Sequence, residues 1–280
     1  MPTQMEYEKV LQSDEFQTLN DYSEQFLHHY AGLLGGFSRK WVSSPLAQWS
    51  RRWEYVFVWE TIQEAVALNK DVNVLDAGSG VTFFPYYLKE QFPTAKVFCC
   101  DYDATFENIY SELNRNRNTD GEAGNRSNLN VQFDCADLRK LPYQDNQFDL
   151  LYCISVLEHT DCYEDILLEF RRVLAPGGRL IITFDVSLDG TRDIDVTTSE
   201  HFLATVEQLF QTSETKLPSV ESESQQDNLL TTHAEAFAQG QYLPWKYPSV
   251  LYQLQALLQG KGLVSWPPKL GVYGLVAQKL

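Results

Sequence analysis

The chain has 280 residues, 44% of them apolar and 21% charged, which predicts a globular protein with one large domain or a core and an appended cap. Its net charge of −16 argues against a nucleic-acid partner, because a phosphate-binding surface needs a basic stripe and the basic residues here are scattered.

Residues 1–69 are predicted to form an N-terminal helical cap. The segment from Glu6 to Tyr30 places apolar side chains near one face, which predicts one or two amphipathic helices. Ser44-Pro45 is typical of a helix start, with a hydroxyl cap followed by proline in the first turn. We expect that helix to run to about Asn69.

Residues 70–185 alternate apolar, strand-like runs with helical segments. Strands are expected over 72–77, 96–101, 130–133, 148–154 and 179–184, and helices over 82–91, 104–113 and 163–174. Strands separated by helices imply right-handed crossovers and a parallel sheet. This segment is therefore predicted to be an α/β core.

The last two segments are less regular. Residues 186–248 include the tract SESESQQDN and are predicted to be an insertion that carries a helix over about 199–210 and forms a substrate lid. Residues 249–280 are expected to supply a C-terminal helix, from about 248 to 258, and two last strands, over 263–266 and 273–278, that complete the sheet.

The stretch VNVLDAGSGVTFFP, residues 72–85, is an apolar run followed by Asp76 and then by the glycine pair Gly78 and Gly80. Glycine permits a sharp turn and a close approach to a ligand. In an open α/β sheet, ligands bind outside the carboxyl ends of the strands. A dinucleotide fingerprint needs a third glycine where Phe83 stands. The turn thus predicts a bound ligand and disfavours a nicotinamide-dependent oxidoreductase.

Two further acids follow predicted strands. Asp101 ends the second strand, where a carboxylate can accept both hydroxyls of a ribose; the alternative is a helix cap, since Asp103 and Thr105 follow. Asp137 and Leu138 follow the third strand. There a carboxylate and a backbone amide can together bind an adenine edge.

Residues 141–184 run from a polar turn through an apolar strand to Glu158-His159, a helix, a glycine turn and a fifth strand. Together with the three features above, this order resembles the class I S-adenosylmethionine-dependent methyltransferases. The turn LPYQDNQFD, the LEH ending and the R-x-L-x-PGG segment resemble the small-molecule branch. The resemblance implies a Rossmann-like, mostly parallel seven-stranded sheet flanked by helices, with the cap and the insertion added.

The resemblance also implies roles for individual positions, with S-adenosyl-L-methionine as cofactor and S-adenosyl-L-homocysteine as product. Residues of the glycine turn would line its methionine part, Asp101 would bind the ribose, and the other positions would contact the adenine or lie beneath the sulfonium. The implied cofactor-binding residues are Asp76, Gly78, Ser79, Gly80, Asp101, Tyr102, Asp137, Leu138, Ile154 and Ser155.

Methyl transfer is an in-line displacement that mainly requires alignment and exclusion of water, so a catalytic triad is not needed. His159 is the candidate general base, because a neutral imidazole accepts protons near neutral pH. Its alternative role is structural, holding the loop after the fourth strand. The candidate substrate-binding residues are Glu158, His159, Tyr22, Trp53 and Asp185.

The leading functional hypothesis is transfer of a methyl group to nitrogen or oxygen of a small organic molecule, possibly in specialised metabolism. The alternatives are a protein or peptide side-chain methyltransferase and a catalytically silent, cofactor-binding regulatory protein. The acceptor atom, the substrate and the use of a base are left open. So is the choice between a monomer and a homodimer.

The location is predicted to be cytoplasmic. The five cysteines form no Cys-x-x-Cys pair and show no zinc spacing, so no metal site is predicted. Several of them fall inside apolar runs as free thiols, which favours a reducing compartment. The polar opening MPTQMEYEKV does not predict a signal peptide, and no apolar run approaches the ~20 residues of a membrane helix.

Overall fold

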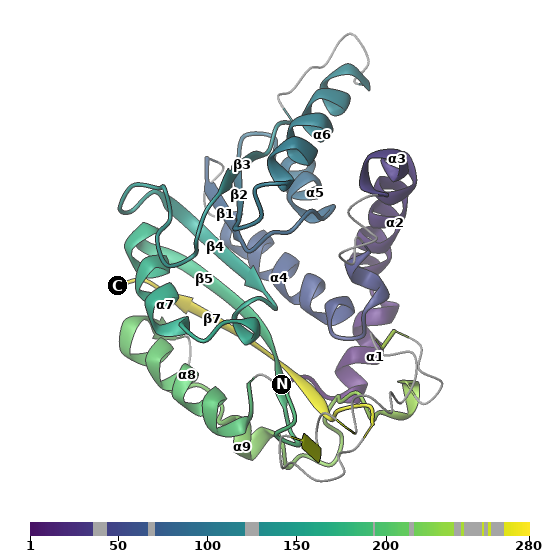
Figure 1. The fold of residues 1–280 in the computed structure, drawn as a ribbon, viewed down its shortest axis with the longest axis vertical. Helices are drawn as coiled ribbons and strands as arrows, with labels where there is room; N and C mark the ends of the chain where they lie inside the picture. The colour runs from purple at the N-terminus through teal and green to yellow at the C-terminus, as the bar shows by residue number, and fades with distance from the viewer. Residues whose placement is uncertain are drawn as a thin grey trace.

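The computed structural model describes residues 1–35, 44–66, 71–120, 129–192, 194–212, 216–237, 242–243, 254, 257–258 and 266–280. Within these ranges seven strands form one sheet in the order β3-β2-β1-β4-β5-β7-β6 (Figure 1). Their bounds are β1 Asn73–Ala77, β2 Lys96–Asp101, β3 Gln132–Cys135, β4 Phe148–Ile154, β5 Leu174–Ser187, β6 Gln211–Thr212 and β7 Leu270–Gln278.

The sheet is mostly parallel. The strands β3, β2, β1, β4 and β5 pair in parallel, whereas β7 runs antiparallel to both β5 and β6. The predicted Rossmann-like sheet is therefore confirmed. The predicted strands 96–101 and 148–154 coincide with β2 and β4.

Both faces of the sheet are buried. Along β1 and β4, Val74 and Leu150 point into one hydrophobic core, while Leu75 and Leu151 point into the other, as the alternation of side chains along a strand requires. The first core is covered by α2 Asp14–His29, α4 Arg51–Val66, α5 Phe84–Gln91 and α6 Phe106–Asp120, and the second by α7 Tyr163–Val173 and α8 Val196–Leu209 (Figure 1).

The N-terminal helices are present as α1 Gln4–Gln12, α2 and the short α3 Ala31–Leu34. A capping box on Thr3 begins α1, and the Ser13 hydroxyl, which accepts from the Phe16 amide, begins α2. The apolar stripe of α2, with Phe16, Leu19 and Phe26, is buried in the first core as its spacing predicts.

The helix expected to begin at Ser44-Pro45 is interrupted, so that prediction was wrong. A 3-10 turn, η1 Pro45–Ala47, is followed by the extended residue Gln48, and α4 begins only at Arg51. Trp49 lies at this break and is 1% exposed, and its backbone amide donates a hydrogen bond to the Tyr242 carbonyl. Burial of one indole thus outweighs the helical propensity of the segment. Residues 67–70 lie outside the described part of the chain.

The C-terminal half contains one strand that was not expected from the sequence. The last strand is present as β7, but its second neighbour is the two-residue β6, which the pattern did not predict. The helix expected over 248–258 and the strand expected over 263–266 lie mostly outside the described residues. Two short elements, α9 Val220–Glu223 and the 3-10 turn η3 Glu235–Phe237, occupy the segment between β6 and β7.

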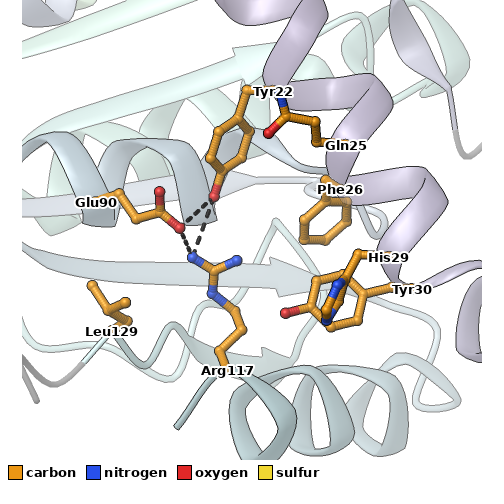
Figure 2. Close-up of a pocket in the computed structure, with 8 residues that line it drawn as sticks. All are labelled: Tyr22, Gln25, Phe26, His29, Tyr30, Glu90, Arg117 and Leu129. Carbon is orange, nitrogen blue, oxygen red and sulfur yellow. Dashed lines mark hydrogen bonds and ion pairs between the residues drawn. The ribbon is translucent and has the colours of Figure 1, made fainter. Parts of the chain in front are cut away.

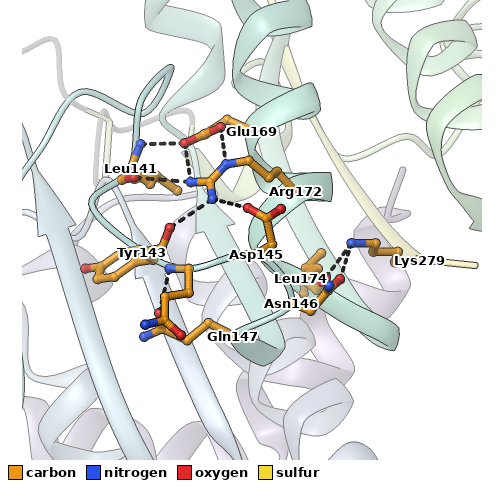
Figure 3. Close-up of polar contacts among 10 residues, drawn as sticks. Leu141, Tyr143, Asp145, Asn146, Gln147, Glu169, Arg172, Leu174 and Lys279 are labelled. Carbon is orange, nitrogen blue, oxygen red and sulfur yellow. Dashed lines mark hydrogen bonds and ion pairs between the residues drawn. The ribbon is translucent and has the colours of Figure 1, made fainter.

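Arg172, near the end of α7, fastens the polar turn that precedes β4 (Figure 3). Its Nη1 donates to the Tyr143 carbonyl at 2.9 Å and to Asp145 at 2.7 Å, and its Nη2 donates to Glu169 at 2.7 Å. Glu169 in turn accepts the Leu141 amide at 2.7 Å. The LPYQDNQFD turn and the R-x-L-x-PGG segment are therefore joined by one cation, which gives this part of the motif a structural role.

Candidate active site

The glycine turn joins β1 to α5 at the carboxyl edge of the sheet. Gly78 and Gly80 have φ angles of +77° and +52°, a region that side-chain-bearing residues rarely occupy. The amides of Gly78 and Ser79 both donate to the Cys100 carbonyl, at 2.9 and 3.0 Å. A Cβ on Gly78 would lie 2.6 Å from Cγ2 of Val156. The turn is thus held against the end of β2 and needs glycine at position 78.

Asp101, at the end of β2, is bonded to that turn. Its Oδ2 accepts the Gly80 amide at 3.0 Å, and its Oδ1 accepts the Asp103 amide at 3.2 Å. The Thr105 amide is accepted by Asp103 at 3.0 Å, so the cap-like bond at the start of α6 belongs to Asp103. The structure therefore brings Asp101 together with Gly80, as the sequence prediction requires.

Asp76 lies in β1 just before the turn and is 5% exposed. Burial raises the pKa of Asp76 to about 8; the Tyr152 hydroxyl opposes this shift and the nearby Asp101 carboxylate adds to it. A buried carboxyl of this kind ionises readily once a cationic group is placed beside it. The position therefore suits the positively charged part of a ligand.

The loop after β3 lies beside Asp101, because the Ala136 amide donates to the Asp101 carbonyl at 2.8 Å. Asp137 is exposed and paired with Arg139 at 2.6 Å, and hydrogen bonds from Arg139 lower the pKa of Asp137 to about 2. Leu138 is half-buried, and Tyr102 is 75% exposed. These three positions follow the ends of β2 and β3, and Asp137 already forms an ion pair with Arg139.

At the end of β4, Ile154 is half-buried and Ser155 adopts a φ of +46°. The Ser155 hydroxyl donates to Glu54 Oε1 at 2.6 Å and accepts from Arg51 Nη1. The Ser155 amide donates to the Thr183 carbonyl of β5 at 2.9 Å. A strained residue held by three partners is typical of a functional site.

Three carboxylates surround Arg51 and form what we name the acidic cluster: Glu54 of α4, Glu158 of the 3-10 turn η2 Leu157–His159, and Asp185 of β5. Arg51 Nη1 lies 2.6 Å from Glu54 Oε2, and the attraction of the three carboxylates raises the pKa of Arg51 against the effect of its burial. Burial raises the pKa of Glu158 to about 7 and that of Asp185 to about 8, with Arg51 opposing both.

The acidic cluster is incompletely bonded. Glu54 and Glu158 are 0% and 4% exposed. Glu158 Oε1 accepts a long bond of 3.5 Å from the Asp185 amide. Within the described part of the chain, Glu158 Oε2 and Asp185 Oδ1 are buried and have no hydrogen-bond partner. Such oxygens are costly unless a donor reaches them.

Comparison with known proteins identifies proteins that this chain resembles. Residues 75–182 match the family model described as "Methyltransferase domain". The sterol 4-C-methyltransferase strm-1 of Caenorhabditis elegans is 27% identical over 50% of this chain and 38% of its own length. A demethylmenaquinone methyltransferase of Deinococcus radiodurans is 30% identical over 44% of this chain and 48% of its own.

The crystal structure of the cyclase SpnF shares the fold, with a TM-score of 0.51 and 19% identity over 92% of this chain and 96% of that one. The matched segment, the sheet order and the glycine turn all indicate the same fold. Residues 75–182 therefore carry a methyltransferase domain, with the fold of the class I S-adenosylmethionine-dependent methyltransferase family. The cofactor of this family is S-adenosyl-L-methionine. The chain spans less than half the length of the curated relatives that it matches.

The predicted base, His159, is exposed on the same 3-10 turn that buries Glu158. Its backbone amide donates to the Val156 carbonyl at 3.0 Å and so closes the turn. The turn therefore separates the two neighbours, directing Glu158 inward to the acidic cluster and His159 outward. The catalytic role of His159 stays a prediction.

Tyr22 lies in a different place from the acidic cluster. It lines a cavity of about 370 Å³ between α2, α5 and α6 (Figure 2). There its hydroxyl donates to Glu90 at 2.7 Å and accepts from Arg117 at 3.2 Å. None of the residues that line this cavity belongs to the glycine turn or to the acidic cluster. Its role in substrate binding stays a prediction.

Trp53, the other predicted cap residue, stacks on Phe57 with ring centroids 4.9 Å apart. Both rings cover Gly274 of β7, since a Cβ there would lie 2.7 Å from the Trp53 ring. Trp53 thus packs on the strand that pairs with β5 at Thr183. Its role in binding substrate also stays a prediction.

Glu54 of the acidic cluster and the cation at its centre, Arg51, were not foreseen. The sequence did contain a signal for them. Glu54 stands in the run Trp53-Glu54-Tyr55-Val56, whose other residues are of types that form cores. A glutamate buried in such a run is almost always paired, which would have pointed to a nearby cation. Among the described residues, no group of three or more His, Cys, Asp or Glu side chains is arranged to hold a metal ion. None of the described helices is both long and apolar enough to cross a membrane.

Proposed function

We propose that the chain transfers the methyl group of S-adenosyl-L-methionine to nitrogen or oxygen of a small organic molecule. The observation that carries this proposal is the position of the acidic cluster. It lies at the ends of β4 and β5, on the same sheet edge as Asp76 and Asp101, and it presents carboxylate oxygens for which the described residues offer no hydrogen-bond partner. A nucleophile that bears a proton needs an acceptor for it at that edge.

The residues of this edge fit the charged parts of the cofactor. The methionine portion carries an ammonium, for which the buried Asp76 carboxyl is a complementary partner. Asp101 suits the ribose hydroxyls, and Asp137 with the Leu138 amide suits the adenine edge beside Tyr102. A Cβ on Gly80 would meet no atom within 4 Å, so the backbone of this turn is open to close approach by a ligand at Gly80. Ile154 and Ser155 would lie beneath the bound cofactor.

When bound, the cofactor supplies an electrophilic methyl group on a sulfonium, and the electron pair of the broken carbon–sulfur bond stays on sulfur. The chain's own residues orient the two reactants, exclude water and accept a proton. Orientation of this kind can supply about 7–11 kcal/mol of a barrier. Glu158 and Asp185, which are turned inward, are better placed to accept a proton than the exposed His159.

A small-molecule acceptor is favoured by the burial of the cluster under α4, because a protein side chain would need an open approach. A protein-directed enzyme and a silent regulatory protein are the alternatives. The name of the strm-1 relative specifies a carbon acceptor, so carbon nucleophiles belong in any test. We also propose a cytoplasmic protein, monomeric or homodimeric, without a nucleic-acid or membrane partner.

The test is transfer of labelled methyl from S-adenosyl-L-methionine to a panel of amines, phenols, carboxylic acids, carbon nucleophiles and peptides, with calorimetric binding of S-adenosyl-L-homocysteine as a second readout. We expect binding of the product cofactor, no binding of NADH, and label in a small molecule. Label found only in peptides would favour the protein-directed alternative. Binding without any transfer would favour the regulatory one.

A further inference from the structure

The acidic cluster carries more negative charge than its own cation neutralises. Three carboxylates, from Glu54, Glu158 and Asp185, face the single guanidinium of Arg51. When all are ionised, two negative charges remain in a buried site. Isolated buried charges are costly, so the arrangement is stable only if protons or a cationic ligand compensate them.

The unpartnered atoms of the site are hydrogen-bond acceptors. Glu158 Oε2 and Asp185 Oδ1 are buried without a partner among the described residues, as is the hydroxyl of Thr183. Thr183 precedes Asp185 by two positions and therefore lies on the same face of β5. The occupant that satisfies such a set must donate hydrogen bonds. An anion or a carbonyl compound brings no donor, and a hydroxyl brings only one.

We propose, on the basis of the function proposed above, that the acidic cluster is the acceptor-binding site and that it takes a protonated amine, whose N–H groups bond Glu158 and Asp185. An ammonium brings several donors and one positive charge, and the sulfonium of the cofactor brings a second positive charge. These two charges balance the two negative charges that Arg51 leaves uncompensated. A neutral phenol or alcohol would leave one of them buried and unbalanced.

The proton transfers that the reaction requires can take place at this site. An ammonium has no free electron pair, so it must first give one proton to a carboxylate of the cluster. The neutral amine nitrogen then forms the new bond to the methyl carbon while the carbon–sulfur bond breaks. The methylated product leaves as an ammonium, and the proton held by the carboxyl group passes to solvent. Atoms and charge balance without any oxidant or further reactant.

Arg51 and Glu54 come from a helix that packs on the sheet, whereas Glu158 and Asp185 follow or belong to its strands. Both come from the N-terminal half of α4, and both contact Ser155 at the end of β4. Glu54 has both oxygens engaged, one by Ser155 and one by Arg51, whereas Glu158 and Asp185 retain the unpartnered atoms. The two acids that would contact the amine are therefore Glu158 and Asp185.

The experiment measures equilibrium binding near neutral pH to the full chain saturated with S-adenosyl-L-homocysteine. Its probes are matched pairs with one carbon skeleton each: benzylamine and benzyl alcohol, butylamine and butanol, tryptamine and tryptophol. We expect at least one amine to bind about tenfold or more tightly than its alcohol, as charge-assisted hydrogen bonds imply. Glu158→Gln and Asp185→Asn should each remove most of that preference.

The matched control is Asp161→Asn, which removes one negative charge from an exposed position three residues after Glu158 and should leave the preference unchanged. The proposal is overturned if alcohols bind as tightly as amines, if no amine binds, or if the preference survives in both cluster variants. The comparison in the wild-type protein needs no variant to fold. Loss of product-cofactor binding or of methyl transfer to every acceptor would instead refute the proposed function.

Discussion

Gly78 and Val156 meet across the carboxyl edge of the sheet, where a Cβ on residue 78 would stand 2.6 Å from one Val156 methyl and 2.8 Å from the other. The contact links the glycine turn after β1 to the residue that follows Ser155. It therefore joins the segment assigned to the cofactor with the segment that carries the acidic cluster. A change at position 78 should disturb both.

We expect Gly78→Ala to destabilise the protein by about 2–4 kcal/mol, through a strained φ and overpacking against Val156. It should also weaken binding of S-adenosyl-L-homocysteine. Urea unfolding and calorimetry measure the two effects. Gly80→Ala is the control, since its φ is +52° but no atom lies within 4 Å of the added Cβ, so only about 1–2 kcal/mol is expected. Adding Val156→Ala to Gly78→Ala should recover the overpacking part; no recovery would contradict the steric explanation.

Asp101→Asn should reduce affinity for S-adenosyl-L-homocysteine about tenfold or more, because the loss of charge weakens the bond to the Gly80 amide and the proposed bonds to the ribose hydroxyls. Titration calorimetry gives the affinity. Asp103→Asn, in which the altered group accepts bonds from Thr105 at the start of α6, should bind the ligand nearly as well as the wild type. Equal losses in the two variants would mean that Asp101 has no special part in the site.

The acidic cluster should make stability fall as pH rises. Burial raises the pKa of Asp185 from 3.8 to about 8, so the folded protein retains a proton that the unfolded chain has released over that interval. Because the folded state binds more protons there, the free energy of unfolding decreases from the acid end of the window to its alkaline end. Arg51, Glu54, Glu158 and the Ser50 hydroxyl are the groups that face Asp185.

Thermal unfolding of the ligand-free protein at several pH values tests this dependence. Asp185→Asn cannot ionise and should flatten the curve, raising the midpoint near pH 8 by about 3 °C or more over the wild type. Asp161→Asn shows how much of the slope comes from the overall negative charge. If Asp185→Asn and Asp161→Asn behave alike, burial of the cluster is not the cause.

Arg172→Ala should lower the free energy of unfolding by about 2 kcal/mol, because it removes charged hydrogen bonds to Glu169 and Asp145 and one to the Tyr143 carbonyl. Arg115→Ala, which removes an exposed pair with Glu112, should change it by less than about 0.5 kcal/mol. Denaturant unfolding measures both values. Product-cofactor affinity of the folded Arg172 variant should stay unchanged, in keeping with a structural role.

Glu158→Gln should lower kcat by about 100-fold or more if its carboxylate takes the proton, and should flatten the acidic limb of the pH–rate profile. His159→Asn should lower kcat by less than about threefold, because an exposed imidazole makes a small contribution. Steady-state kinetics over a pH range distinguish the two positions. The reverse ranking would establish His159 as the base and leave Glu158 as a binding residue.

The sequence was most informative where local residues alone determine a strand and the turn that follows it. β2 and β4 were predicted with their bounds because apolar runs are flanked there by polar turns, and Asp101 and Gly80 come together because they follow neighbouring strands. The two-residue β6 could not be foreseen, since only its pairing with β7 makes it a strand.

The cap was less predictable for the same reason. Whether Pro45 begins a long helix depends on the pocket that receives Trp49, and no local pattern encodes that pocket. Arg51 and Glu54 reach the site only because α4 docks on the first core, which is a contact between segments far apart in the chain. Periodicity gives the buried face of such a helix but not its neighbour.

The place of β7 also sets the order in which the molecule can be assembled during translation. β1 through β4, with the glycine turn and Asp101, leave the ribosome long before Leu270–Gln278, and only that last strand gives β5 its second neighbour and, among the described strands, gives β6 any neighbour at all. A nascent chain thus completes the cofactor side first, while the strand that carries Asp185 still has an open edge. Open edges invite pairing with other chains, so the interval before β7 is synthesised is the stage most exposed to aggregation.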